Sequence, residues 1–183
     1  MKSRPVPPQT VHQHLAWAYA NLARADAALR HGVSRYGTVH HVIRAKLYKG
    51  LGDGTMSLGS LVDDERVKLL QVPRCGYCGS EDHLAIDHVM PKARGAGDWP
   101  ENLVLACRSF NSSKRDRDMI GWLLARGDFH PLMLLRRYLK LAFAVSTENE
   151  WLALDLTALP ALSPPWDPTN FPLHFPDLPQ LRH

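Results

Sequence analysis

The chain of 183 residues is 45% hydrophobic and 22% charged, a balance typical of a globular protein that excludes a disordered or fibrous one. It has a net charge of +4 and only three cysteines, which excludes a disulfide framework. No run of about 18 apolar residues is present that would span a membrane. Residues 1–15 also lack the apolar stretch of a secretion signal, so we expect a cytoplasmic protein without membrane association.

Residues 1–72 have the pattern of three helices. After a proline-rich start, Thr10 can cap a first helix whose apolar side chains recur every three or four residues from Val11 to Leu29. A second helix is expected over residues 38–51. A third follows Ser60 and ends before Pro73. We therefore predict a helical N-terminal region.

The pattern changes in residues 73–117. Two short apolar runs, LAID at 84–87 and LVLA at 103–106, are separated by a loop rich in glycine, proline and charge. Such runs predict two strands with a long connection. A helix is expected to follow from about Cys107.

Residues 118–159 are expected to be helical, with a strongly apolar helix beginning at Pro131, where proline suits the first turn. The last 24 residues contain seven of the fourteen prolines, together with Trp166, Phe171 and Phe175. This composition prevents a helix, and the aromatic side chains argue against free disorder. We expect residues 160–183 to lie extended over this protein's own surface or over a partner.

Basic residues concentrate between Val89 and Arg117, a range that contains six basic residues and three acidic ones. A local basic surface is the electrostatic signature of binding to a polyanion such as nucleic acid. A solvated surface without a partner would have the same composition, so charge alone leaves both interpretations open.

Polar side chains stand at the ends of the two expected strands. Asp87 and His88 close the first strand, and Asn102 comes just before the second. Asn111 follows in the next helix, with Lys114 three residues later on the same helical face. An Asp-His dipeptide is common by chance, whereas five such positions at these spacings indicate a site.

These segments, CGYCG, LAIDHVMPKARG and ENLVLACRSFNSSK, resemble the HNH endonucleases of the ββα-metal class, in the variant with Asn as the third motif residue. The resemblance implies a small ββα-metal nuclease core in residues 73–117. Together with the helices expected from the sequence pattern, it predicts an α+β, mostly helical protein. Helices in residues 1–72 and 118–159 and an extended proline-rich tail at 160–183 would flank that core.

The resemblance also implies a metal-dependent endonuclease that hydrolyses phosphodiester bonds, with DNA as the expected substrate. His88 would be the general base, since imidazole titrates near neutral pH, and Asn102 would orient the loop that carries it. Asp87 and Asn111 would hold one Mg²⁺ or Mn²⁺, which prefer hard oxygen ligands. Four basic residues would contact phosphate: Lys92, Arg94, Lys114 and Arg115.

The three cysteines raise a separate question about structural zinc. Cys75 and Cys78 form a C-x-x-C pair and Cys107 begins a second one, but Phe110 stands where the fourth sulfur would be. His83 is the nearest candidate for a fourth ligand. The bulk of Phe110 favours the alternative, in which the thiols bind no metal and the ring fills the space.

Two other functions remain open alongside the nuclease. One is a non-catalytic nucleic-acid-binding module, and the other is a scaffold subunit with a degenerate nuclease fold. Retention of every polar position of the motif favours the nuclease. Family association further suggests the nuclease subunit of a bacterial defence or restriction complex, with a protein partner such as an ATPase. The sequence does not define the strandedness or sequence of the substrate, because backbone contacts carry no base information.

Overall fold

The structure is a computed structural model that describes residues 8–181. Prolines 5 and 7 of the expected proline-rich start and the last two residues of the tail lie outside this range. The expected α+β, mostly helical fold is confirmed. None of the described helices has an apolar stretch long enough to cross a bilayer. In chain order the elements are α1 (Val11–Arg30), α2 (Thr38–Gly52), α3 (Leu61–Leu70), β1 (Leu84–His88), β2 (Leu103–Cys107), α4 (Arg108–Lys114), α5 (Met119–Ala125) and α6 (Leu132–Glu148).

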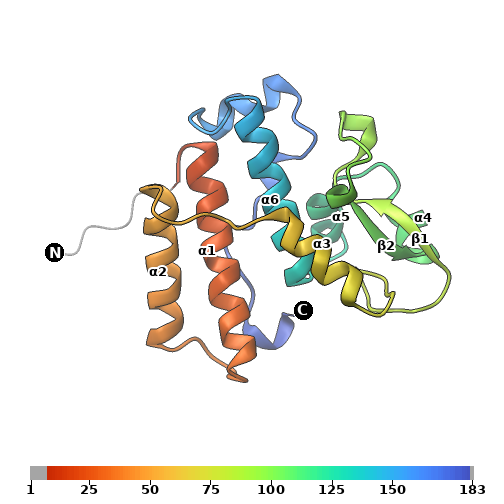
Figure 1. Ribbon diagram of the computed structural model, residues 1–183, viewed down its shortest axis with the longest axis horizontal. Coiled ribbons are helices and arrows are strands. Elements are labelled where there is room, and N and C mark those ends of the chain that lie inside the picture. The colour runs from red at the N-terminus through yellow and green to blue at the C-terminus, as the bar shows by residue number, and fades with distance from the viewer. Residues whose placement is uncertain (1–7, 182–183) are drawn as a thin grey trace.

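Helix α1 begins at the predicted cap. Thr10 Oγ1 accepts from the backbone N–H of Gln13 at 3.2 Å, and Gln13 Oε1 accepts from the backbone N–H of Thr10 at 3.3 Å. The buried side of α1 carries small and aliphatic residues such as Leu15 and Ala18. It packs between α2 and α6, and these three helices form one side of the molecule (Figure 1).

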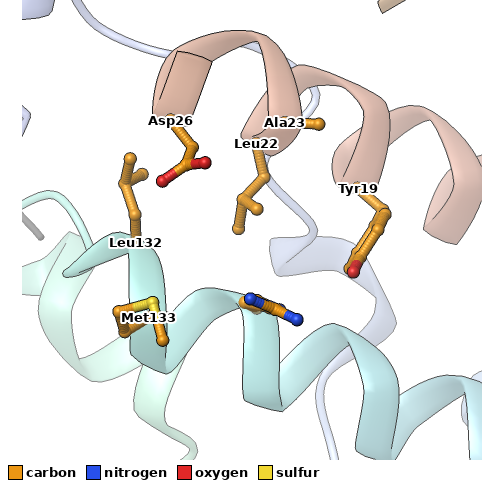
Figure 2. A pocket seen from close by; sticks show the side chains of 7 residues that line it. Tyr19, Leu22, Ala23, Asp26, Leu132 and Met133 are labelled. Atoms are coloured by element: carbon orange, nitrogen blue, oxygen red, sulfur yellow. The ribbon is translucent and has the colours of Figure 1, made fainter. Parts of the chain in front are cut away.

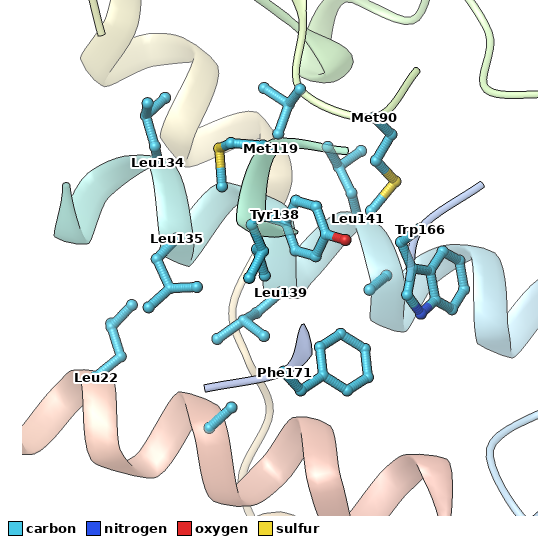
Figure 3. Close-up of a cluster of buried hydrophobic side chains, with 14 of the residues drawn as sticks. Leu22, Met90, Met119, Leu134, Leu135, Tyr138, Leu139, Leu141, Trp166 and Phe171 are labelled. Atoms are coloured by element: carbon cyan, nitrogen blue, oxygen red, sulfur yellow. The ribbon is translucent and has the colours of Figure 1, made fainter. Parts of the chain in front are cut away.

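The hydrophobic core lies where α1, α6 and the C-terminal tail meet (Figure 3). Tyr138 of α6 and Trp166 of the tail are fully buried there. The tail lies on this chain's own surface as short 3-10 turns and extended segments. Its Leu173 carbonyl accepts a hydrogen bond from the Trp17 indole at 3.1 Å. Its aromatic side chains therefore complete the core of the helical part.

Helix α5 was not predicted as a separate element, because seven residues are too few to show a helical period. Asp118 caps its N-terminus, since the Asp118 carboxylate accepts from the backbone N–H of Gly121 at 3.2 Å. Helix α5 carries the buried Trp122, whose ring meets that of Phe110 at 5.6 Å. This contact joins α5 to the motif-bearing unit.

The β1, β2 and α4 segments form a ββα unit at the other side of the molecule (Figure 1). Two cationic side chains attach it to the helical part through the 3-10 turn Pro100–Asn102. Lys68 of α3 donates to the carbonyls of residues 100 and 103, at 2.9 and 3.2 Å. Arg137 of α6 donates to the carbonyl of residue 101 at 3.1 Å. Glu65 pairs with both cations, so α3 and α6 hold the turn that leads into β2.

Candidate active site and thiol cluster

The ββα unit brings the motif residues to one place. Strands β1 and β2 pair antiparallel, with Asp87 opposite Val104 and His88 opposite Leu103, and α4 follows β2 without an intervening residue. Because α4 packs back on both strands, Asn111 comes to lie beside the end of β1. A surface cavity of about 200 Å³ results, lined by Ile86, Asp87, His88, Pro91, Lys92, Asn111, Lys114, Arg115 and Asp116.

Asp87 is buried at this cavity and is held by two side chains. Its Oδ2 accepts from the Tyr77 hydroxyl at 2.5 Å, and its Oδ1 accepts from Lys114 Nζ at 3.3 Å. Burial, followed by the charge of Asp87, raises the pKa of Tyr77 well above its usual value, so that Tyr77 stays a donor. The carboxylate is thus anchored and charge-compensated within the protein.

Lys114 differs from its expected role as a phosphate contact. Its side chain is fully buried, and its Nζ donates to the His88 carbonyl at 2.5 Å as well as to Asp87. Burial lowers the pKa of Lys114, and the Asp87 carboxylate opposes that shift. Since its ammonium is already bound to protein oxygens, Lys114 joins the end of β1 to α4.

His88 has a partner that the sequence did not reveal. Its Nε2 lies 2.7 Å from Asp98 Oδ1, and Asp98 Oδ2 accepts from Lys92 Nζ at 2.7 Å. Hydrogen bonds from Lys92 and then from His88 lower the pKa of Asp98. Because a carboxylate only accepts, Nε2 of a neutral His88 carries the proton and Nδ1 keeps its lone pair. Asp98 belongs to no motif and lies in a glycine-rich loop, so spacing gave no signal for it.

Asn102 is completely buried and does not line the cavity. Its Oδ1 accepts from the backbone N–H of Met90 at 2.8 Å, and its Nδ2 donates to the carbonyls of Met90 and Gly97 at 3.1 and 3.0 Å. The carboxamide therefore closes the ends of a loop over residues 90–97. This loop carries Lys92 and leads into Asp98, the two residues that lie beside the imidazole.

The remaining basic residues are placed differently. Arg94 is exposed on the same loop but does not line the cavity. Arg115 lines it and has backbone angles of φ +52° and ψ −132°, a left-handed conformation that is strained for a residue with a side chain.

The three cysteines meet beside this site. Their sulfur atoms all lie within 4.8 Å of one another, and those of Cys78 and Cys107 are 3.8 Å apart. Burial would raise the pKa of Cys75, but backbone N–H groups of Cys107, Cys78 and Tyr77 lower it below its usual value. The pKa of Cys78 is raised to about 11, first of all by burial.

His83 does not join this cluster. Its side chain is exposed, and among the described residues only the three cysteines bring metal-ligand atoms of this kind together. In this structure His83 therefore offers no ligand atom beside the three sulfur atoms. Phe110 instead stacks on Tyr77, with ring centroids 6.0 Å apart and planes 9° from parallel.

A comparison with protein families agrees with this geometry. Residues 75–117 match the family model of the HNH endonuclease. This HNH segment covers about a quarter of the chain and includes every motif residue discussed above, while the helices on both sides fall outside it. Searches of curated proteins and of solved structures returned no match.

The donor atoms of the HNH segment suit two kinds of metal. Asp87 and Asn111 offer a carboxylate and a carboxamide oxygen at a cavity with room for several waters, which fits Mg²⁺ or Mn²⁺. Asp87 keeps free lone pairs after its two hydrogen bonds. The three thiols fit a softer ion such as zinc.

A second cavity, of about 100 Å³, lies between α1 and α6 (Figure 2). It is lined by Tyr19, Leu22, Ala23, Asp26, Leu132, Met133 and Arg136. None of these belongs to the HNH segment. The cavity at Asp87 and His88 is therefore the candidate active site.

Proposed function

We propose that this protein is a metal-dependent endonuclease that hydrolyses phosphodiester bonds of nucleic acid, most readily DNA. One observation carries the proposal: Asp87 and His88 at the end of β1 and Asn111 of α4 line one basic-rimmed cavity, although the loop over residues 90–97 and strand β2 separate them in the chain. A phosphodiester brings negative charge and needs an activated water, and this cavity offers a base, oxygen ligands and cations.

His88 acts as the general base in this proposal. Its Nδ1 takes a proton from a water molecule, whose oxygen then bonds to phosphorus as the bond to the leaving sugar oxygen breaks. Asp98 holds Nε2 at 2.7 Å and stabilises the imidazolium that forms. Asn102 keeps the loop in place that leads into Asp98.

Asp87 and Asn111 hold the cation. A bound Mg²⁺ or Mn²⁺ would supply a positive charge that offsets the charge on the leaving oxygen. Lys114 fixes Asp87 from behind rather than contacting the substrate. Lys92 and Arg115 at the cavity, with Arg94 farther along the loop, contact the phosphates.

Zinc in the thiol cluster is a further part of this proposal, with Cys75, Cys78 and Cys107 as its protein ligands. Elemental analysis tests this part. One zinc per chain would support the site, and a protein without zinc would contradict it. A place in a bacterial defence complex, with an ATPase as partner, stays a prediction from family resemblance.

The test is incubation of purified protein with plasmid, linear duplex, single-stranded DNA and RNA, each with Mg²⁺ or with EDTA. Cleavage of DNA that stops in EDTA and falls sharply in His88→Ala is the expected result. Salt-sensitive binding without cleavage of any substrate would instead support the non-catalytic binding module.

A further inference from the structure

We infer that Tyr77 is the positioning residue of Asp87, and that the thiol cluster and Phe110 serve the active site by fixing Tyr77. The inference rests on the proposed role of Asp87 as a cation ligand. In this role the C-x-x-C loop supports the proposed active site in addition to stabilising the fold.

Tyr77 contacts the Asp87 carboxylate directly. The Tyr77 hydroxyl donates to Asp87 Oδ2 at 2.5 Å, and the whole tyrosine side chain is buried, with 1% of the residue exposed. A hydrogen bond to a buried carboxylate is strong and directional. The other partner of that carboxylate, Lys114, approaches the opposite oxygen at 3.3 Å. Tyr77 and Lys114 therefore bind the two different oxygens of Asp87, and together they fix the orientation of the carboxylate.

The tyrosine itself is held by its neighbours in sequence and by two aromatic rings. Tyr77 lies in sequence between Cys75 and Cys78, so the conformation of the thiol loop fixes its backbone. Its ring is stacked against Phe110 and meets Trp122 edge-on at 5.1 Å. Three segments, the thiol loop, α4 and α5, thus determine where one hydroxyl points.

The loop is also pressed against the helical scaffold. A Cβ atom at Gly76 would come within 3.2 Å of the Leu134 side chain of α6, so the loop backbone approaches α6 closely at this glycine. The backbone N–H of Gly76 donates to the Leu105 carbonyl of β2 at 2.8 Å. Little freedom remains for Tyr77 to move away from Asp87.

This arrangement accounts for Phe110. The residue stands where a fourth cysteine would complete the metal site, yet it supports the same loop by stacking on Tyr77. Phe110 and Asn111 are neighbours on α4, so the element that carries one proposed cation ligand also braces the tyrosine that orients the other.

The test compares Tyr77→Phe with Tyr48→Phe, a partly buried tyrosine of α2 that meets Trp17 edge-on, far from the HNH segment. Mn²⁺ affinity is measured without nucleic acid, by electron paramagnetic resonance of free Mn²⁺, and folding is followed by thermal unfolding. Substitution of a residue that hydrogen-bonds to a metal ligand typically lowers metal affinity about 10- to 100-fold. We expect a loss in that range for Tyr77→Phe and a change below about twofold for Tyr48→Phe.

Asp87→Asn provides the second arm. In that background Tyr77→Phe should have no further effect on Mn²⁺ affinity, because the hydroxyl acts through the carboxylate. A folded Tyr77→Phe protein with wild-type Mn²⁺ affinity would overturn the inference. Mn²⁺ binding by a wild-type protein that cleaves no nucleic acid would overturn the proposed function alone, and the comparison of the tyrosines would still stand.

Discussion

Helices α1 and α6 bury mainly apolar side chains against each other, whereas the much smaller HNH segment buries Asp87 and Lys114 at its cavity and Asn102 at the ends of the loop over residues 90–97. Apolar contacts are non-directional and tolerate small shifts. Buried polar groups need partners at defined angles, and each lost partner leaves an unsatisfied group. We therefore expect the helical scaffold to supply most of the stability, while the buried polar contacts of the HNH segment fix the positions of the motif residues. Substitutions in the two regions should therefore affect different measurements.

The largest effect on stability is expected in the scaffold. Leu139 of α6 is fully buried, so Leu139→Ala should lower the free energy of unfolding by about 2–5 kcal/mol through lost burial and a cavity. The cleavage rate per folded molecule should stay unchanged. Urea unfolding and a cleavage assay at a temperature where the variant is folded would measure both. Leu69→Ala, at a residue 80% exposed, is the matched control and should change stability by less than about 0.5 kcal/mol.

Acid should weaken the scaffold through His130. Burial lowers the pKa of His130 from 6.5 to about 4. The unfolded chain therefore binds a proton between these values that the folded chain does not, so stability falls as pH drops from about 6.5 to 4. The shift is equivalent to about 3 kcal/mol at most. His130→Gln, which cannot titrate, should reduce the slope of unfolding free energy against pH. An unchanged slope would show that His130 is not the group responsible.

Substitution of Lys68, which joins α3 to the turn before β2, should change both stability and cleavage rate. Lys68→Met removes the donor to two backbone carbonyls beside Asn102, and because Lys68 is a third exposed, water can replace part of what is lost. We expect about 1 kcal/mol lower stability and a cleavage rate reduced about tenfold. Lys46→Met, on the exposed side of α2, is the control. Equal rates in the two variants would mean that the scaffold does not position the site.

The smallest effect is expected at Arg115, where one residue combines backbone strain with a positive charge at the cavity. Arg115→Gly removes the strain of a positive φ and should raise stability by about 1 kcal/mol, while it removes a cation from the cavity and slows cleavage. Arg115→Lys keeps both the strain and the charge. This variant should therefore show no gain in stability and should retain part of the cleavage activity. Loss of stability in Arg115→Gly would show that this conformation is not strained.

The sequence predicted what depends on local pattern. The apolar stripe from Val11 to Leu29 located α1, and two short apolar runs located β1 and β2 to within one residue. The match of residues 75–117 confirms the resemblance to HNH endonucleases. These features are encoded within one element or one motif.

What the sequence missed depends on tertiary contact. Asp98 contacts His88 at the end of the loop that Asn102 closes, and the spacing of residues in the sequence contains no sign of that contact. Lys114 was expected to face phosphate, since its spacing shows the helix face but not its depth of burial. Likewise, Tyr77 occupies a variable position of the C-x-x-C loop, and its hydroxyl meets Asp87 only in the folded chain.

The proposed cleavage is assigned to the polar cavity of the HNH segment, with His88 as the general base. Single-turnover cleavage of plasmid DNA in Mg²⁺ by wild type and His88→Ala tests it most directly, with thermal unfolding and Mn²⁺ affinity measured on the same samples. We predict a rate about 10² to 10⁴-fold lower in His88→Ala, with unchanged folding and Mn²⁺ affinity, because only the general base is lost. Equal cleavage rates for the two proteins would contradict the account.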